Sequence, residues 1–136
     1  MTPSLGPGPS SGQVRFAGYA ALFDRIDRGG DVIRSGAFAT AAPPVPIYWQ
    51  HDPARRIGEV EAVCEDARGL RVIGRVGVAL EPGAGLSFGY RVRDAGAGTP
   101  RELRTLDLIE VSVVTHPMQP LARVHAVEII GSPQGD

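Results

Sequence analysis

The sequence of 136 residues contains no lysine and no asparagine, a single cysteine and no long apolar segment. One cysteine, Cys64, can form neither an internal disulfide nor a cysteine-based zinc site. No apolar run approaches the ~20 residues that a membrane-spanning helix needs, and no signal peptide opens the chain. These absences exclude a disulfide-rich secreted domain and a helical membrane protein, and they favour an intracellular protein.

The sequence also has no excess of charge of either sign. The basic residues are 14 arginines against 15 acidic residues, so the formal net charge is −1 at pH 7. The arginines are spread from Arg15 to Arg123 with acidic residues between them, and no basic stripe of the kind that binds nucleic acid is present. We therefore expect neither a nucleic-acid partner nor a membrane partner.

Glycine and proline are abundant, at 18 and 12 residues. Inside a helix they cost roughly 1 and 3 kcal/mol each relative to alanine. The longest segment free of both runs only from Arg101 to His116. This composition excludes a helical bundle and a coiled coil, whereas the 43% of hydrophobic residues suffices for the core of one small domain.

The two ends of the chain differ from the rest in composition. Residues 1–12 predict a flexible lead and residues 131–136 a flexible tail, which leaves residues 13–130 as a single folded domain. Within that domain apolar residues alternate with a period of two, which is typical of strands. The predicted strands are residues 14–21, 45–51, 57–63, 70–76, 86–93, 108–115 and 122–130. One short helix is predicted from Ser35 to the pair Pro43-Pro44.

The predicted fold class is mainly β, α+β at most. The number of short strands predicts a closed or nearly closed small β-barrel of about seven strands with one or two short helices.

Two serines, Ser87 and Ser112, lie in predicted strands and remain as candidate nucleophiles. Ser87 lies in the segment GLSFG (85–89), which matches the G-x-S-x-G pattern of a nucleophile elbow. That elbow requires a strand, a sharp turn and then a helix, whereas residues 88–93 continue a strand. We reject the elbow, and the residue pattern leaves Ser87 as either a solvent-facing strand serine or a nucleophile.

A serine nucleophile needs a general base, and the imidazole group suits this role near neutral pH. The sequence has three histidines. His51 ends a predicted strand before the turn Asp52-Pro53, whereas His116 and His125 have plain structural explanations. Their spacing supports no metal site, and we expect neither a metal nor a cofactor.

An acid is the usual third member of such a site. Strand alternation places Glu110, Ser112 and His116 on one face of the strand 108–115 and its end. At ~3.3 Å per residue, Glu110 and His116 lie about 20 Å apart, so both cannot orient the same imidazole. The residues alone do not choose between a site acid and a solvated strand acid at Glu110.

Six short segments follow one another in a familiar order. They are GYA (18–20), GDVIRSGAF (30–38), WQHD (49–52), GLRV (69–72), GLSFGYR (85–91) and IEVSVVT (109–115). Together they resemble the prohead (capsid-maturation) serine proteases of tailed phages over nearly all of residues 14–128. That family is regarded as related to the herpesvirus maturation protease, so the resemblance implies a herpesvirus-protease-like β-barrel with its catalytic residues on the outer surface.

The resemblance also implies roles for individual residues. It places the nucleophile at Ser87 and its general base at His51, with Glu110 as the third member of the triad. The herpesvirus enzymes use a second histidine in that position, so His116 stays an alternative to Glu110, and a His-Ser dyad is a further one.

Further implications concern the substrate. Arg91 and Arg123 are weak candidates for oxyanion or substrate contacts. The implied activity is that of a serine endopeptidase that cleaves the scaffolding portion of the major capsid protein, and itself, inside the assembling prohead in the bacterial host cytoplasm.

One departure from the family keeps other functions open. Relatives carry a helix between Arg75 and Ser87, and here residues 76–86 are too short and too rich in glycine and proline for it. One alternative is therefore a catalytically reduced or inactive β-barrel of the family that binds capsid or scaffold protein as an assembly factor. Another is a ligand-binding barrel unrelated to capsids, in which His51 and Ser87 lie far apart. A homodimer, and an origin in a lytic phage, a prophage or a domesticated particle such as a gene transfer agent, also stay open.

Overall fold

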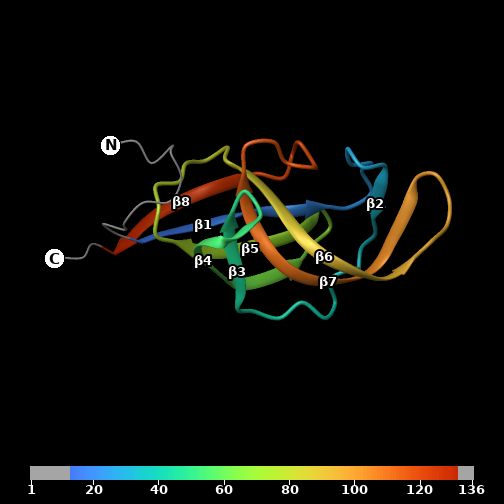
Figure 1. Cartoon of the computed structure of the whole chain (residues 1–136), viewed down its shortest axis with the longest axis horizontal. Helices are drawn as coiled ribbons and strands as arrows, with labels where there is room; N and C mark the ends of the chain where they lie inside the picture. The colour runs from blue at the N-terminus through green and yellow to red at the C-terminus, as the bar shows by residue number, and fades with distance from the viewer. Residues whose placement is uncertain (1–12, 132–136) are drawn as a thin grey trace.

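A computed structural model of the chain describes residues 13–131, which form one eight-stranded sheet (Figure 1). The strands are β1 (Gln13–Leu22), β2 (Asp31–Ile33), β3 (Val45–Trp49), β4 (Asp52–Glu65), β5 (Gly69–Val76), β6 (Gly85–Ala95), β7 (Arg101–Val114) and β8 (Val124–Gly131). The mainly-β prediction is confirmed for these residues. The predicted flexible lead and all but the first residue of the predicted tail lie outside the described part of the chain.

Strand β7 pairs with three other strands, β2, β3 and β6. The strand order is β2-β7-β3-β4-β5-β1-β8, and β6 pairs with β7 off this path. One edge of β7 pairs with β6 in the antiparallel sense, while the other edge pairs in parallel with β2 at its start and with β3 at its end. Figure 1 shows β6 and β7 as a long curved hairpin that extends beyond β2.

The sheet is not closed, so the predicted β-barrel is not confirmed. Near the start of β6, one isolated bridge joins Gly85 to Arg123, and backbone hydrogen bonds join Gly83 and Ala84 to Val124. Within residues 13–131, no further strand ladder joins β6 to β8. The reason is that β6 leaves β8 after this bridge and continues along β7 alone to the tip of their hairpin.

The short helix predicted from Ser35 is wrong, because residues 35–40 form consecutive tight turns. Their backbone hydrogen bonds span three residues instead of four, and Gly36 has a φ of 93°. The carboxylate of Glu65, on β4, accepts hydrogen bonds from the backbone N–H groups of Gly36 and Phe38, both at 2.7 Å. A contact with a strand distant in sequence thus fixes this segment as turns. No helix occurs in the described residues, those of the 77–84 loop included.

The hydrophobic core lies on the inner side of the curved sheet and draws on all eight strands. Its large, fully buried side chains include those of Phe16, Ile33, Ile47, Val60, Leu70, Val72, Leu86, Leu103, Leu106 and Val111. Burial of such side chains contributes about 1.5–3 kcal/mol each, and it fixes which face of every strand points inward.

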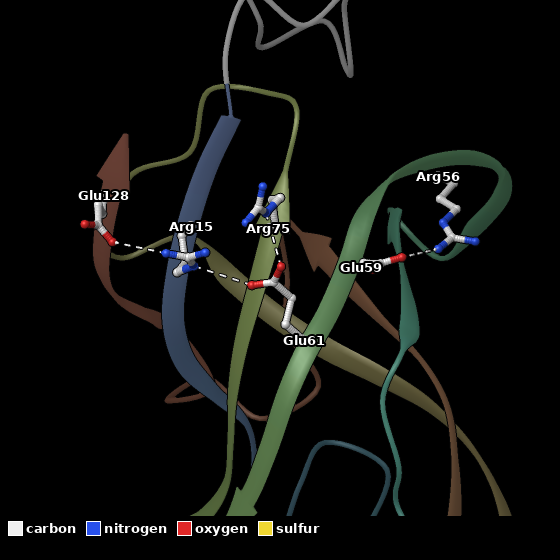
Figure 2. Close-up of polar contacts among 6 residues, drawn as sticks. All are labelled: Arg15, Arg56, Glu59, Glu61, Arg75 and Glu128. Carbon is white, nitrogen blue, oxygen red and sulfur yellow. Dashed lines mark hydrogen bonds and ion pairs between the residues drawn. The ribbon is translucent and has the colours of Figure 1, made fainter. Parts of the chain in front are cut away.

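The outer face of β1, β4, β5 and β8 carries charges of both signs, joined in ion pairs (Figure 2). Arg15 lies 3.4 Å from Glu61 and 3.9 Å from Glu128, and Arg75 lies 3.1 Å from Glu61. These side chains are exposed enough that such pairs typically contribute only about 0–1 kcal/mol each. The arginines here face carboxylates, in agreement with the absence of a basic stripe in the sequence.

Two glutamates of β4 therefore differ in their effect on stability. Glu65→Ala removes two hydrogen bonds to backbone N–H groups, and we expect it to lower the free energy of unfolding by about 1–3 kcal/mol. Glu61→Ala removes only exposed ion pairs, and its expected cost is under about 1 kcal/mol. Urea unfolding of the two variants measures the difference, and equal losses would contradict the role given to Glu65.

Candidate active site

The site begins with the position of β7 between two other strands. In the antiparallel ladder with β6, Ser112 lies opposite Ser87 and Glu110 lies opposite Gly89. In the parallel ladder with β3, Ser112 lies opposite Tyr48, three residues before His51. The register of β7 thus brings Ser87, Glu110 and the end of β3 to one place.

His51 lies in a tight turn instead of at the end of a strand. Trp49 pairs with Asp52, so Gln50 and His51 are the two central residues of the β3–β4 hairpin. Their φ angles are 54° and 61°. Two positive φ angles define a type I′ turn, in which Asn-Gly is the favoured sequence. Side chains other than glycine in this region cost on the order of 1–3 kcal/mol each, so other contacts must hold the turn.

Strand β7 and Thr115, the residue directly after it, supply those contacts. The backbone N–H of Gln50 donates to the carbonyl oxygen of Val113 at 2.9 Å. The Gln50 side chain accepts from the N–H of Thr115 at 2.9 Å and donates to its hydroxyl at 3.2 Å. The N–H of His51 donates to Oγ of Ser112 at 3.1 Å. The strained turn is thus fastened to the strand that carries Glu110.

Glu110 and His51 are in direct contact. Nδ1 of His51 lies 2.7 Å from Oε2 of Glu110, and the hydroxyl of Ser112 donates to Oε1 at 2.6 Å. Glu110 is only 7% exposed, so it is not the solvated strand acid that the sequence left open. An ionised carboxylate only accepts hydrogen bonds, so opposite an ionised Glu110 the proton of a neutral imidazole lies on Nδ1 and Nε2 has the free lone pair. A general base needs this tautomer.

Ser87 and His51 line the same pocket. The other lining residues are Ala20, Asp27, Leu86, Phe88, Tyr90, Met118 and Gln119. Ser87 is 8% exposed, so the solvent-facing alternative does not describe it. Among the described residues, no hydrogen bond joins Ser87 to His51. The two side chains nevertheless share one pocket, whereas the ligand-binding-barrel alternative expected them to lie far apart.

Gln119 and Tyr90 are polar side chains that line the pocket. The amide of Gln119 is buried and bonds both the N–H and the carbonyl oxygen of Leu22, at 2.8 and 2.9 Å. Burial raises the pKa of Tyr90, and the negative charges of Asp31 and Asp27 raise it further. The Tyr90 phenol therefore stays neutral around pH 7.

The remaining predicted site residues lie elsewhere. His116 is exposed beyond the end of β7 and is not among the pocket residues. Arg91 points to Asp107, at 3.9 Å. Arg123 donates to the carbonyl oxygens of Pro120 and Gly83, at 2.8 and 3.2 Å, and so ties two loops together. Neither arginine lines the pocket.

The glycines of the G-x-S-x-G segment have a packing role. Strand β6 runs without interruption through Ser87, which confirms that the segment is not a nucleophile elbow. A Cβ at Gly85 would lie 2.6 Å from the carbonyl oxygen of Val114. A Cβ at Gly89 would lie within 2.4 Å of Oε2 of Glu110. Gly89 thus provides the space that the carboxylate occupies beside His51.

Sequence reasoning missed Gly89 and Gln50, and it singled out Ser112 only as a candidate nucleophile. Alternation did place Ser112 on the same face as Glu110, and this was the available signal. The pairing of β7 with β3 joins Tyr48 to Ser112, which lie far apart in the chain. Neither this register nor that of the β6–β7 hairpin could be read from the alternation of one strand.

The described residues meet the requirements of neither a metal site nor a membrane-spanning helix. No three His, Cys, Asp or Glu side chains in residues 13–131 are grouped so that they could hold a metal ion. Nor does this part of the chain contain a helix long and apolar enough to cross a membrane.

The close approach of Gly89 to the Glu110 carboxylate can be tested by adding a methyl group at position 89. In Gly89→Ala the new methyl group displaces the carboxylate, so the low-field proton resonance expected for Nδ1–H of His51 should disappear in NMR spectra. Gly96→Ala in the same hairpin is the control, because its Cβ would meet the flexible end of Arg104 at 3.2 Å and Cβ of Glu102 at an ordinary van der Waals distance of 3.8 Å. A resonance that survives in Gly89→Ala would show that the carboxylate does not need this space.

A family model and a curated relative agree with the resemblance. Residues 7–132 match the family model described as caudovirus prohead serine protease. The prohead protease of Enterobacteria phage HK97 is 27% identical over 136 residues, covering 85% of this chain and 60% of that protein's length. The structure of varicella-zoster virus protease matches with 28% identity and a TM-score of 0.39, over 47% of this chain and 31% of that one. Because the family match extends over most of its length, the chain belongs to the caudovirus prohead serine protease family.

Proposed function

We propose that this chain is a serine endopeptidase of prohead maturation, in which Ser87 is the nucleophile, His51 the general base and Glu110 the residue that orients His51. The observation that carries the proposal is the buried carboxylate of Glu110 on Nδ1 of His51, with Ser87 in the same pocket. Family membership supports the reaction class.

The proposed reaction starts with attack of Ser87 Oγ on the carbonyl carbon of the scissile peptide bond. Nε2 of His51 takes the hydroxyl proton, and the charge of Glu110 stabilises the imidazolium that forms. When the C–N bond breaks, His51 gives the proton to the leaving amine, and an acyl-enzyme remains on Ser87. A water molecule, deprotonated by His51, then hydrolyses this ester and restores the serine.

The reaction requires Nε2 of His51 to come within hydrogen-bond reach of Ser87. Catalytic hydrogen bonds are often long in structures without substrate and tighten when substrate binds. The His51 side chain is 43% exposed and so has room to turn, while its backbone is held by Ser112. Substrate in the pocket would exclude water and bring the two groups together.

The proposed substrate is the scaffolding portion of the major capsid protein, and the protease chain itself is a second one. The matched relative from phage HK97 is called a prohead protease, and the chain spans 60% of its length. The pocket beside Ser87 has apolar walls at Ala20, Leu86 and Phe88, and it accepts a side chain of the bound peptide in this proposal.

Removal of the nucleophile tests the activity. The chain and the capsid protein encoded with it are co-expressed, and trimming of the capsid protein is followed by gel electrophoresis and mass spectrometry. We expect Ser87→Ala to reduce trimming on the order of 10⁴-fold or more. Trimming that persists in Ser87→Ala would refute the assignment of Ser87 as the nucleophile. Binding of capsid protein without trimming by the unmodified chain would instead support the assembly-factor alternative.

The third member of the triad is tested separately. Glu110→Gln keeps the shape of the side chain but no longer enforces the Nδ1–H tautomer, and we expect its rate of trimming to fall on the order of 10³- to 10⁴-fold. His116→Ala is the matched control, because His116 lies outside the pocket, and its rate should stay within about two-fold. The reverse order of effects would assign the third position to His116, and equally small effects would indicate a dyad.

A further inference from the structure

The hydroxyl group of Ser112 lies at the centre of the site although it is not the nucleophile. Ser112 is fully buried on β7, opposite Ser87 on β6 and opposite Tyr48 on β3. It does not line the pocket that contains Ser87 and His51. A substrate carbonyl in that pocket therefore cannot reach it.

Both hydrogen bonds of this hydroxyl have a fixed direction. Oγ of Ser112 lies 2.6 Å from Oε1 of Glu110 and 3.1 Å from the backbone nitrogen of His51. A backbone N–H can only donate and an ionised carboxylate can only accept. The hydroxyl must therefore accept from His51 and donate to Glu110, and it has a single orientation.

The Ser112 side chain therefore positions both partners of the contact between Glu110 and His51. By holding Oε1, Ser112 turns the other carboxylate oxygen toward Nδ1 of His51. By accepting from the His51 N–H, it holds that residue in its left-handed conformation, with a φ of 61°. Without this hydroxyl, the buried oxygen Oε1 and the His51 N–H each lose a partner.

We propose that Ser112 is a positioning residue, which fixes Glu110 and the His51 backbone relative to each other so that the imidazole keeps its Nδ1–H tautomer. The inference rests on the proposed function, in which His51 acts as the general base through Nε2. Ser112 touches neither the substrate nor the reacting atoms.

The test compares three variants at this position. Ser112→Ala removes both hydrogen bonds, Ser112→Cys replaces the hydroxyl by a weaker donor of similar shape, and Ser112→Thr keeps the hydroxyl. Thr115→Ala is the matched control, because it removes only the bond from the Gln50 side chain to the Thr115 hydroxyl and keeps the backbone N–H bond to Gln50. It leaves the hydrogen bonds among Ser112, Glu110 and His51 in place. Urea unfolding confirms that each variant is folded.

The first readout does not depend on activity. In the inactive Ser87→Ala background, nitrogen-15 NMR reports the tautomer of His51, and proton NMR reports its Nδ1–H. We expect Ser112→Ala and Ser112→Cys to lose the low-field Nδ1–H resonance and to show a mixture of tautomers. Ser112→Thr and Thr115→Ala should keep the resonance. If Ser112→Ala is unfolded, Ser112→Cys gives the answer.

The second readout is the rate of capsid-protein cleavage with Ser87 intact. We expect kcat to fall about 10- to 100-fold in Ser112→Ala with KM within about two-fold, on the scale found for the outer hydrogen-bond partners of metal-binding histidines. Ser112→Thr should recover most of this loss. An unchanged tautomer and kcat in Ser112→Ala, or an equal loss in Thr115→Ala, would overturn the proposal. Failure of the unmodified chain to cleave would refute the proposed function, whereas the NMR result would still decide the role of Ser112.

Discussion

The burial of one charged group, the carboxylate of Glu110, is the constraint on which the arrangement of the site depends. A buried carboxylate is costly unless its oxygens have hydrogen-bond partners. Here one oxygen faces Ser112 and the other faces His51. The strand opposite provides the necessary space through Gly89. The same strand that carries the acid holds the unfavourable turn at Gln50 and His51. The hydrogen bonds that the buried carboxylate needs therefore also fix the positions of His51 and Ser112.

Six short segments carried the resemblance to the family, and three of them meet at this carboxylate. The segment WQHD (49–52) is the hairpin turn, GLSFGYR (85–91) contributes the serine and the glycine opposite the acid, and IEVSVVT (109–115) contributes the acid and its hydroxyl partner. Glycine, serine and glutamate are thus needed at fixed positions because β7 pairs with β6 on one edge and with β3 on the other. Residues far apart in the sequence are linked by one local geometry.

Much of the fold could be predicted from alternation, because inward and outward side chains repeat every two residues in a strand. The strands on either side of the turn at Asp66, and the shared face of Glu110 and Ser112, were found in this way. The turns at residues 35–40 could not be found, since they depend on Glu65 of a distant strand. The open sheet could not be predicted either, because it depends on the point along β6 at which its contact with the start of β8 ends. The contact between His51 and Glu110 joins positions 59 residues apart. The residue pattern of a single strand does not indicate which distant strand it pairs with or in which register.

The place of β7 in the chain also sets the order in which the site can form during synthesis. The turn with His51 and the strand with Ser87 are both made before Glu110, Ser112 and Thr115 leave the ribosome. Until then the turn lacks the hydrogen bonds that hold its left-handed backbone, and the imidazole lacks its carboxylate. Until β7 has been synthesised, His51 therefore lacks both the carboxylate and the hydroxyl that position it.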